Sequence, residues 1–207
     1  MDRRSRLARS CLYLVLEARP HGREPDDLLE AALRGGVDIV QLRDKELTDD
    51  ALVAAAAPFR RACERHGALF VLNDRPELVE ACGADGVHVG QTDASVAIAR
   101  AAVGDDRIVG LSIETEEELD AIAGADYLGV GAIFATPTKT EAAAAGLSLV
   151  RAAAQRVRIP WFAIGGIDLD TAAEVVAAGA PGIAVVRAVR DADDPEAAAR
   201  ILTHLFA

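Results

Sequence analysis

Polar side chains suited to an anion-binding site come directly after several short apolar runs of the sequence. Gln41, Arg43 and Lys45 follow the run at 39–42 or lie at its end. Because side chains alternate along an extended chain, these three residues are expected to point the same way. One amide and two cations favour a phosphorylated ligand, since guanidinium and ammonium groups form strong charge-assisted hydrogen bonds with phosphate. Lys45 and Lys139 are also the only lysines of the chain.

Two carboxylates and an amide follow the next apolar runs. Asn73 and Asp74 come after 69–72, and Asp93 follows 86–89 by way of a short glycine-containing loop. An isolated loop aspartate usually caps a helix or stabilises a turn. As a pair beside the two cations, however, Asp74 and Asp93 are predicted to bind Mg2+. This ion takes one or two carboxylates and completes its shell with water and phosphate oxygens.

Further candidate phosphate ligands follow the later apolar runs. Hydroxyls, an ammonium group and backbone N–H groups are ordinary phosphate donors, although each of these residues, taken alone, is also compatible with a turn. His88 lies within the run at 86–89 and is interpreted as a packed core residue rather than a catalyst. The candidates are Ser112, Thr136, Thr138, Lys139, Gly166 and the backbone near Val186.

The elements that must position these residues are eight short strands with helical patterns between them. Eight β-then-α units predict a closed parallel barrel with its active site in the loops after the strands. We therefore expect the α/β class, with a single (β/α)8 TIM barrel over residues 1–207. The open doubly wound sheet is the rival, but it usually has fewer strands, and no GxGxxG follows the first strand here. The predicted strands are 12–16, 39–42, 69–72, 86–89, 108–111, 127–130, 161–164 and 183–186.

Composition narrows the partners and the compartment. The formal net charge is −11, so no basic stripe is available to neutralise a nucleic-acid backbone, and no nucleic acid is expected as a partner. The arginine-rich start precedes an apolar run at 11–16 that is too short for a signal peptide or a membrane span, so neither is expected. Three scattered cysteines are interpreted as small buried residues in a reducing compartment, which predicts a cytoplasmic protein.

Five ordered segments resemble the thiamine phosphate synthase family, and the resemblance spans nearly the whole chain. They are QLRDK at 41–45, LND at 72–74, DGVHVGQTD at 85–93, GADYLGVGAIFATPTKT at 124–140 and AIGGID at 163–168. The resemblance implies a TIM-barrel transferase that joins a hydroxymethylpyrimidine diphosphate to a hydroxyethylthiazole phosphate, giving thiamine phosphate and pyrophosphate. In that family the diphosphate is thought to leave before the thiazole nitrogen attacks, so catalysis would depend mainly on charge stabilisation.

The resemblance also implies roles for the candidate residues. The pyrimidine diphosphate would be held by Gln41, Arg43, Lys45 and Asn73, and Mg2+ by Asp74 and Asp93. The departing pyrophosphate would contact Ser112 and Lys139. The thiazole phosphate would be held by Thr136, Thr138, Gly166 and the backbone near Val186. The catalytic set would be Arg43, Lys45, Ser112 and Lys139.

Three positions depart from the family pattern. Glu114 stands where the family often has His, Ala132 where it often has Pro, and Arg187 where it often has Ser beside the thiazole phosphate. The superfamily includes a thiazole tautomerase branch, which is associated with that His and commonly lacks the Asn-Asp pair. A tautomerase-like isomerase is therefore the alternative, followed by a non-catalytic phosphate-binding barrel. The effect of Arg187, the form of thiazole used and a homo-oligomeric state are left open.

Overall fold

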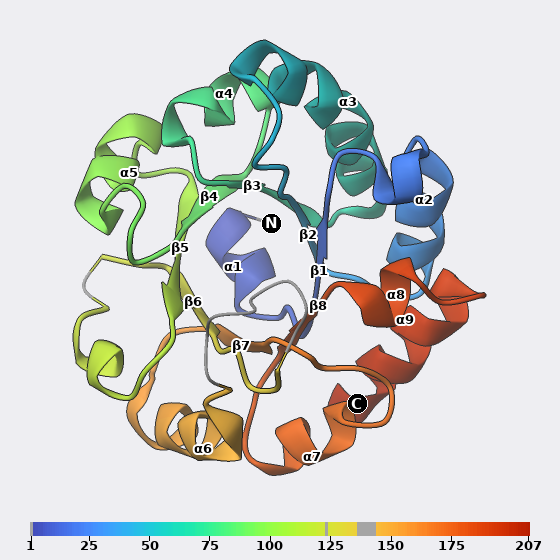
Figure 1. Cartoon of the computed structure of the whole chain (residues 1–207). Coiled ribbons are helices and arrows are strands. Elements are labelled where there is room, and N and C mark those ends of the chain that lie inside the picture. Colours follow the sequence, from blue (N-terminus) through green and yellow to red (C-terminus); the bar gives the residue numbers. More distant parts are fainter. Residues whose placement is uncertain (1, 123, 136–143) are drawn as a thin grey trace.

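The computed structural model describes residues 2–122, 124–135 and 144–207. Eight parallel strands pair in sequence order, and β1 also pairs with β8, which closes the barrel (Figure 1). The predicted (β/α)8 TIM barrel is therefore confirmed. The strands are β1 Leu12–Leu16, β2 Ile39–Leu42, β3 Leu69–Asn73, β4 Gly86–Val89, β5 Ile108–Ile113, β6 Tyr127–Val130, β7 Trp161–Ile164 and β8 Ile183–Val185.

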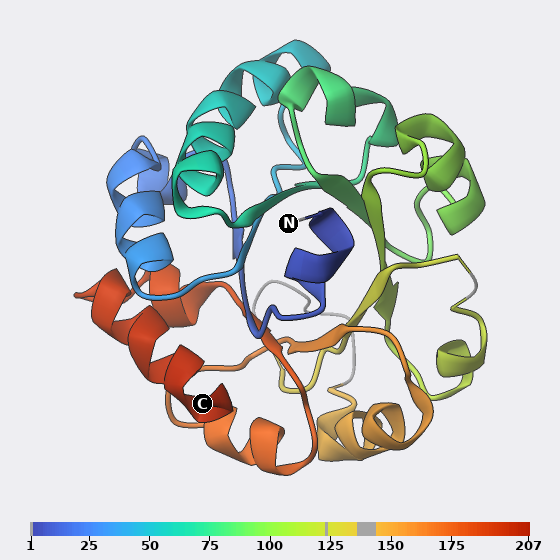
Figure 2. The same cartoon turned by 180° about the vertical axis from the view of Figure 1, so that it is seen from behind.

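The helices form a ring outside the strands, with one exception inside it (Figures 1 and 2). Between β5 and β6 the described residues contain a short 3-10 helix, Glu117–Asp120, instead of an α-helix. The other 3-10 helices are Pro20–Gly22, Pro76–Leu78 and His204–Phe206. The α-helices are α1 Arg3–Leu7, α2 Asp26–Arg34, α3 Asp49–His66, α4 Val79–Cys82, α5 Val96–Val103, α6 Gly146–Arg156, α7 Ala172–Ala177, α8 Arg187–Arg190 and α9 Pro195–Thr203.

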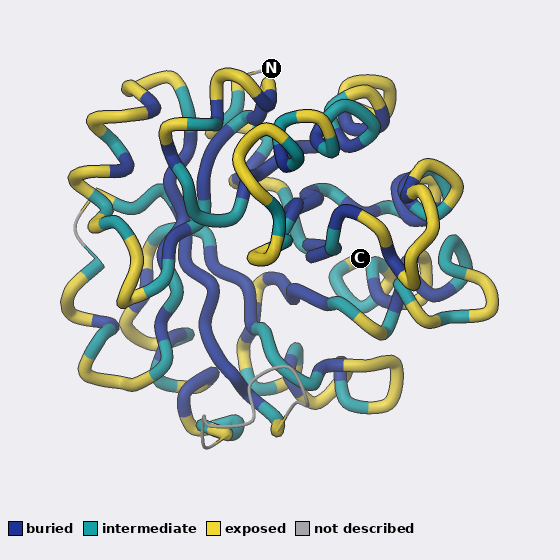
Figure 3. The backbone as a smooth tube through the Cα atoms, turned by 45° about the horizontal axis from the view of Figure 1, so that its top comes forward, coloured by how far each residue is buried: buried dark blue, intermediate teal, exposed yellow. Residues whose placement is uncertain are grey.

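The strands are buried on both faces, as expected when parallel strands lie under helices. In β1, Tyr13 points into the barrel interior and packs with Ile39 and Leu69 of the next two strands. Its neighbours Leu12 and Leu14 belong to the larger cluster between strands and helices. Figure 3 shows this arrangement as buried strands running through the centre of the molecule. The alternation therefore assigns each strand residue either to the barrel interior or to the helix-facing shell.

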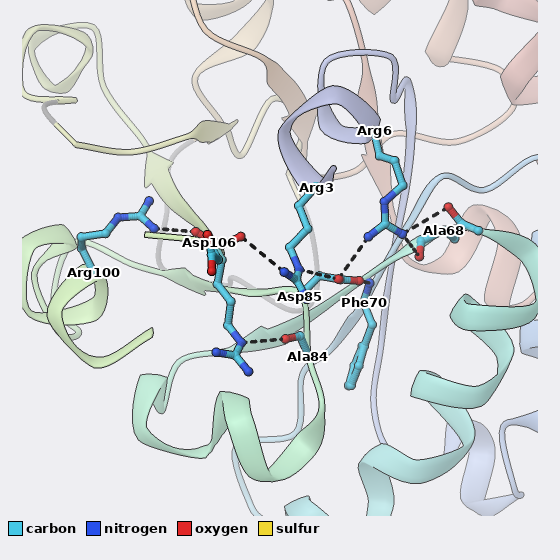
Figure 4. A network of polar contacts seen from close by, with 10 residues as sticks. Arg3, Arg6, Ala68, Phe70, Ala84, Asp85, Arg100 and Asp106 are labelled. Atoms are coloured by element: carbon cyan, nitrogen blue, oxygen red, sulfur yellow. Dashed lines mark hydrogen bonds and ion pairs between the residues drawn. The ribbon is translucent and has the colours of Figure 1, made fainter. Parts of the chain in front are cut away.

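The exception among the helices, α1, closes the end of the barrel at which the strands begin (Figures 1 and 2). Asp2 caps it by accepting a hydrogen bond of 2.9 Å from the Ser5 N–H, and Leu7 at its end is buried in the interior cluster. Arg3 Nε lies 2.7 Å from Asp85 Oδ1, and Arg6 Nη2 lies 3.1 Å from the same oxygen (Figure 4). Asp85 directly precedes β4, so these ion pairs attach α1 to the N-terminal rim of the barrel.

The structure bears on two expectations drawn from composition, the burial of the cysteines and the absence of a membrane span. Cys63 and Cys82 are buried as predicted, Cys11 is half-buried, and all three are free thiols. Burial raises the pKa of the Cys82 thiol, which fits an inert structural residue. Within the described part of the chain, no helix has the length and apolarity that a bilayer crossing requires.

Candidate active site

The predicted carboxylate pair lies at the end of the barrel opposite α1. Asp74 follows the last residue of β3, and its backbone N–H donates a 2.8 Å hydrogen bond to the His88 carbonyl of β4. The Asp74 and Asp93 side chains are within hydrogen-bonding distance of each other. Lys45 Nζ lies 3.4 Å from Asp74 Oδ2. Residues from the ends of three adjacent strands therefore meet at one point, as the sequence predicted.

The two carboxyl groups of this pair have opposite pKa shifts. Burial, together with the neighbouring Asp93, raises the pKa of Asp74, although Lys45 opposes that shift. The pKa of Asp93 is lowered overall, although burial alone would raise it. Hydrogen bonds from Asp74 and the Gly90 N–H lower it, and so do the nearby charges of Lys45 and Arg43. Protonation of Asp74 would relieve the repulsion between two close carboxylates. A bound cation would relieve it as well.

The backbone around the pair is held in unusual conformations. Asp74 has φ 54° and Arg75 has φ 48°, which place two consecutive non-glycine residues in the left-handed region. Such residues cost about 1–3 kcal/mol each and cluster at functional sites. The Gly90 N–H donates a 2.8 Å hydrogen bond to Asp93 Oδ2, and a Cβ on Gly90 would lie 2.7 Å from that oxygen. Glycine at this position therefore gives the carboxylate room to approach the backbone.

This donor set fits Mg2+. The described residues contain no group of three or more His, Cys, Asp or Glu side chains arranged around one metal position. A pair of carboxylates is nevertheless the number that Mg2+ commonly takes from a protein when phosphate oxygens and water supply the rest. Asp74 and Asp93 are the residues that could hold it.

The Gln41, Arg43 and Lys45 triplet is divided between the barrel interior and its rim. Gln41 is only 4% exposed, and its Nε2 donates a 2.8 Å hydrogen bond to the Tyr13 hydroxyl. Arg43 is half-buried and close enough to Asp93 to lower the pKa of that carboxyl. Lys45 is exposed and reaches Asp74. Both predicted cations are thus at the carboxylate pair, whereas the amide lies beneath them.

The other predicted residues fall on the same end of the barrel where the structure describes them. Asn73 is the last residue of β3 and is in register with His88 of β4. Ser112 lies in β5, with its Oγ 3.0 Å from His88 Nε2. Gly166 follows β7 with φ 68°, and Val186 follows β8 and precedes α8. Thr136, Thr138 and Lys139 lie outside the described residues.

Sequence reasoning did not identify three interior residues that contact this site. His88, predicted as a packed core residue, is half-buried and hydrogen-bonded to Ser112 Oγ. Its Nδ1 lies 3.1 Å from the Tyr127 hydroxyl, and Tyr127 in turn contacts Tyr13. The alternation within each strand was the available signal, since it places Tyr13, His88 and Tyr127 on inward-facing positions once the barrel closes.

The three departures from the family pattern have different settings. Glu114 is half-buried in the loop after β5, where its backbone N–H donates to Glu118 Oε2 at 2.6 Å. Ala132 is buried, and Arg187 is an exposed residue at the start of α8. Arg187 therefore lies on the rim next to Val186, on the side predicted to bind the thiazole phosphate.

Comparisons with known proteins agree with this arrangement. The profile of the family described as "Thiamine monophosphate synthase" matches residues 12–189. A thiamine-phosphate synthase of Thermobifida fusca is 48% identical over 200 residues, covering 95% of this chain and 92% of that protein. One from Thermosynechococcus vestitus is 49% identical over 178 residues, covering 85% of this chain and 51% of that protein. The chain thus spans about half the length of some curated relatives and nearly all of others.

Solved structures give the same assignment. A thiamine phosphate pyrophosphorylase from Pyrococcus furiosus superposes with a TM-score of 0.87 at 32% sequence identity, covering 97% of this chain and 96% of that one. A 3-hexulose-6-phosphate synthase, at 22% identity and a TM-score of 0.64, shares the fold alone. With a family match over most of its length and relatives this similar, the chain belongs to the thiamine monophosphate synthase family.

Proposed function

We propose that this chain is a thiamine-phosphate synthase, a transferase that joins a hydroxymethylpyrimidine diphosphate to a hydroxyethylthiazole phosphate and releases pyrophosphate. The observation that carries the proposal is the Asp74 and Asp93 pair with Lys45 beside it, at the C-terminal rim of a barrel of this family. Active sites of such barrels form at that rim. The names of the T. fusca and P. furiosus relatives support the same activity.

Charge distribution at the rim supports the binding of a diphosphate. The chain as a whole carries a formal charge of −11, so an anionic substrate needs local positive charge. Lys45 and Arg43 supply it beside the carboxylates, and the two carboxylates match the charge of one divalent cation. When bound, Mg2+ would neutralise the diphosphate and so favour its departure. In our proposal, Asp74 and Asp93 hold the ion, while Lys45, Arg43 and Asn73 hold the diphosphate.

The remaining assignments follow the charges that develop in the reaction. Loss of pyrophosphate leaves a cationic pyrimidine methylene, which the thiazole nitrogen then attacks, so no strong general base is required. Preorganised donors near the departing anion contribute most to such a step. Ser112 is proposed as one of them, with Lys139 as another. Thr136, Thr138, Gly166 and the backbone near Val186 are proposed for the thiazole phosphate.

The proposed partners are two phosphorylated small molecules. We propose no nucleic-acid or membrane partner and a cytoplasmic location, on the strength of the acidic composition and the free thiols. Arg187 places one more cation next to Val186, on the side proposed for the thiazole phosphate.

The test is thiamine phosphate formation by the purified protein from both substrates, with Mg2+ and with a chelator. Wild type should form product only with Mg2+, and Asp93→Asn should lose roughly 100-fold in turnover, on the scale of removing one preorganised electrostatic contact. Asp105→Asn is the matched control, since Asp105 is an exposed aspartate before β5, at the other end of the barrel. Product formation that withstands the chelator would refute the metal assignment. No product from folded protein would favour the tautomerase-like or binding alternatives.

A further inference from the structure

Five polar side chains form one continuous hydrogen-bonded chain through the barrel interior. It starts at Gln41 Nε2, which lies 2.8 Å from the Tyr13 hydroxyl. The Tyr13 and Tyr127 hydroxyls are 3.0 Å apart, and the Tyr127 hydroxyl lies 3.1 Å from His88 Nδ1. The chain ends where His88 Nε2 lies 3.0 Å from Ser112 Oγ. It therefore connects Gln41, which was predicted to hold the pyrimidine diphosphate and lies in the barrel interior, to Ser112, which was predicted to contact the leaving group.

The interior is shaped to hold this chain. Tyr13 is 3% exposed and Tyr127 is fully buried, and the two rings pack against Phe162 in edge-on contacts. A Cβ on Gly110 would lie 2.1 Å from Tyr127 Cζ and 2.5 Å from His88 Nδ1. The space for the two rings thus depends on glycine at position 110. Burial raises the pKa of both phenols, so each keeps its proton and must place it on an acceptor.

These contacts give the chain a direction. The Gln41 amide nitrogen can only donate, so the Tyr13 oxygen accepts from it. Within the described part of the structure, the proton of Tyr13 then has Tyr127 as its acceptor, and the proton of Tyr127 has His88 Nδ1. A His88 ring that accepts at Nδ1 carries its proton on Nε2 and donates it to Ser112 Oγ. The Ser112 hydroxyl proton is left to point away from His88.

We propose that this chain of hydrogen bonds, from Gln41 to Ser112, holds His88 in the Nε2–H tautomer. It thereby directs the Ser112 hydroxyl proton toward the anion at the active site. His88 and Tyr127 are then positioning residues, and Ser112 is the group that donates to the departing pyrophosphate. The inference rests on the proposed function for the identity of that anion. The backbone of Ser112 is fixed independently, because its carbonyl accepts a 2.7 Å hydrogen bond from Gln91 Nε2. Only the direction of its hydroxyl remains for His88 to set.

The reverse direction makes the opposite chemical prediction. If the Gln41 amide presented its oxygen to Tyr13, every donor in the chain would become an acceptor, and Ser112 would donate to His88. A Ser112 lone pair would then face the anion and repel it. The tautomer of His88 therefore reports which direction the chain takes.

The first test reads this tautomer directly in the substrate-free protein. Long-range proton–nitrogen correlation spectra of 15N-labelled wild type should show a pyridine-type Nδ1 and a pyrrole-type Nε2 for His88. His88→Gln assigns the signals by removing them, and the exposed His21, His66 and His204 serve as internal references. An Nδ1–H tautomer or an imidazolium at His88 would overturn the inference. Since no substrate is present, this outcome is independent of whether the proposed function holds.

The second test compares two matched removals of one phenol oxygen. Tyr127→Phe removes the donor to His88, whereas Tyr13→Phe leaves that donor in place. We expect kcat to fall roughly 10-fold in Tyr127→Phe and less in Tyr13→Phe. Deleting an anion donor such as the Ser112 hydroxyl costs about 100-fold in kcat, and a donor that is present but misdirected should cost only part of that. In a Ser112→Ala background, Tyr127→Phe should cause no further loss of kcat. Equal losses in the two Phe variants, or losses that add to Ser112→Ala, would show a merely structural role.

Discussion

Replacing Asp74 with Asn should stabilise the metal-free protein at neutral pH while abolishing its response to Mg2+. Asn reproduces the protonated form of the Asp74 carboxyl, which can donate to Asp93, without requiring proton uptake. It also tolerates the left-handed conformation at φ 54° at least as well as Asp does. The substitution therefore removes a repulsion and leaves the backbone undisturbed.

The size of the effect follows from two opposing charge interactions. Two full charges about 4 Å apart interact with about 4 kcal/mol at an effective dielectric constant near 20, and a shared proton lowers this repulsion. The Asn variant also loses the attraction between Lys45 and Asp74, but Lys45 is 51% exposed, so that pair contributes only about 0–1 kcal/mol. We expect a net stabilisation on the order of 1 kcal/mol, which corresponds to about 2–4 °C in Tm for a domain of this size.

The pH dependence has a definite sign. Because the pKa of Asp74 is raised in the folded state, its contribution to stability is present at acid pH and is lost as the pH rises through that pKa. The advantage of Asp74→Asn over wild type should therefore be largest at neutral pH and disappear on acidification. The lowered pKa of Asp93 in the wild type acts in the opposite direction, since its contribution to stability is lost as the pH falls through that pKa.

The assay is thermal unfolding in chelator and in Mg2+. At a Mg2+ concentration about ten times its dissociation constant, wild type should gain about 1.4 kcal/mol, and Asp74→Asn should gain almost nothing. Asp105→Asn should behave as wild type throughout. A lower Tm for Asp74→Asn in chelator at neutral pH, or an equal Mg2+ response in both proteins, would refute this account of the carboxylate pair.

Three further substitutions test the packing around the site and at the opposite end of the barrel. Leu7→Ala should cost about 2–4 kcal/mol of unfolding free energy because Leu7 is only 2% exposed, yet kcat well below the melting temperature should be unchanged. A reduced kcat at that temperature would show that α1 affects the rim. Gly110→Ala should reduce the free energy of unfolding by about 1–3 kcal/mol or more, seen as a lower Tm, because the new Cβ collides with Tyr127 and His88. The same collision should reduce turnover. Ser95→Ala should cost about 1 kcal/mol by removing the N-cap of α5, seen as a lower Tm with unchanged kcat.

The strands could be predicted closely because their apolar runs are buried on both faces. All eight exist, and the discrepancies fall at the rim. β3 continues to Asn73 and β5 to Ile113, beyond the predicted ends at 72 and 111, because their last inward positions carry polar residues that an apolar pattern excludes. β8 ends at Val185, since Val186 leaves the extended conformation at φ −118° and ψ −81°.

The closing helix and the interior polar chain could not be predicted in the same way. α1 has five residues, too few to be stable alone, and its partners are distant in sequence, with Arg3 and Asp85 separated by 82 positions. The contacts between Gln41, Tyr13 and Tyr127 exist only after the barrel closes. For the carboxylate pair, by contrast, adjacent parallel strands bring their ends together whatever the details of packing, so spacing along the chain was sufficient.

The closure of the barrel by α1 has a consequence for how substrates enter and products leave the site. In the described residues, α1 covers the end of the barrel where the strands begin, and side chains fill the interior, so the site opens at the C-terminal rim. Among the described residues, α1 and this interior packing lie behind a molecule bound at the C-terminal rim, so we expect it to enter and leave by that rim. Two substrates and two products would therefore pass through the same opening. Release of the last product would then limit how soon the next substrate can bind.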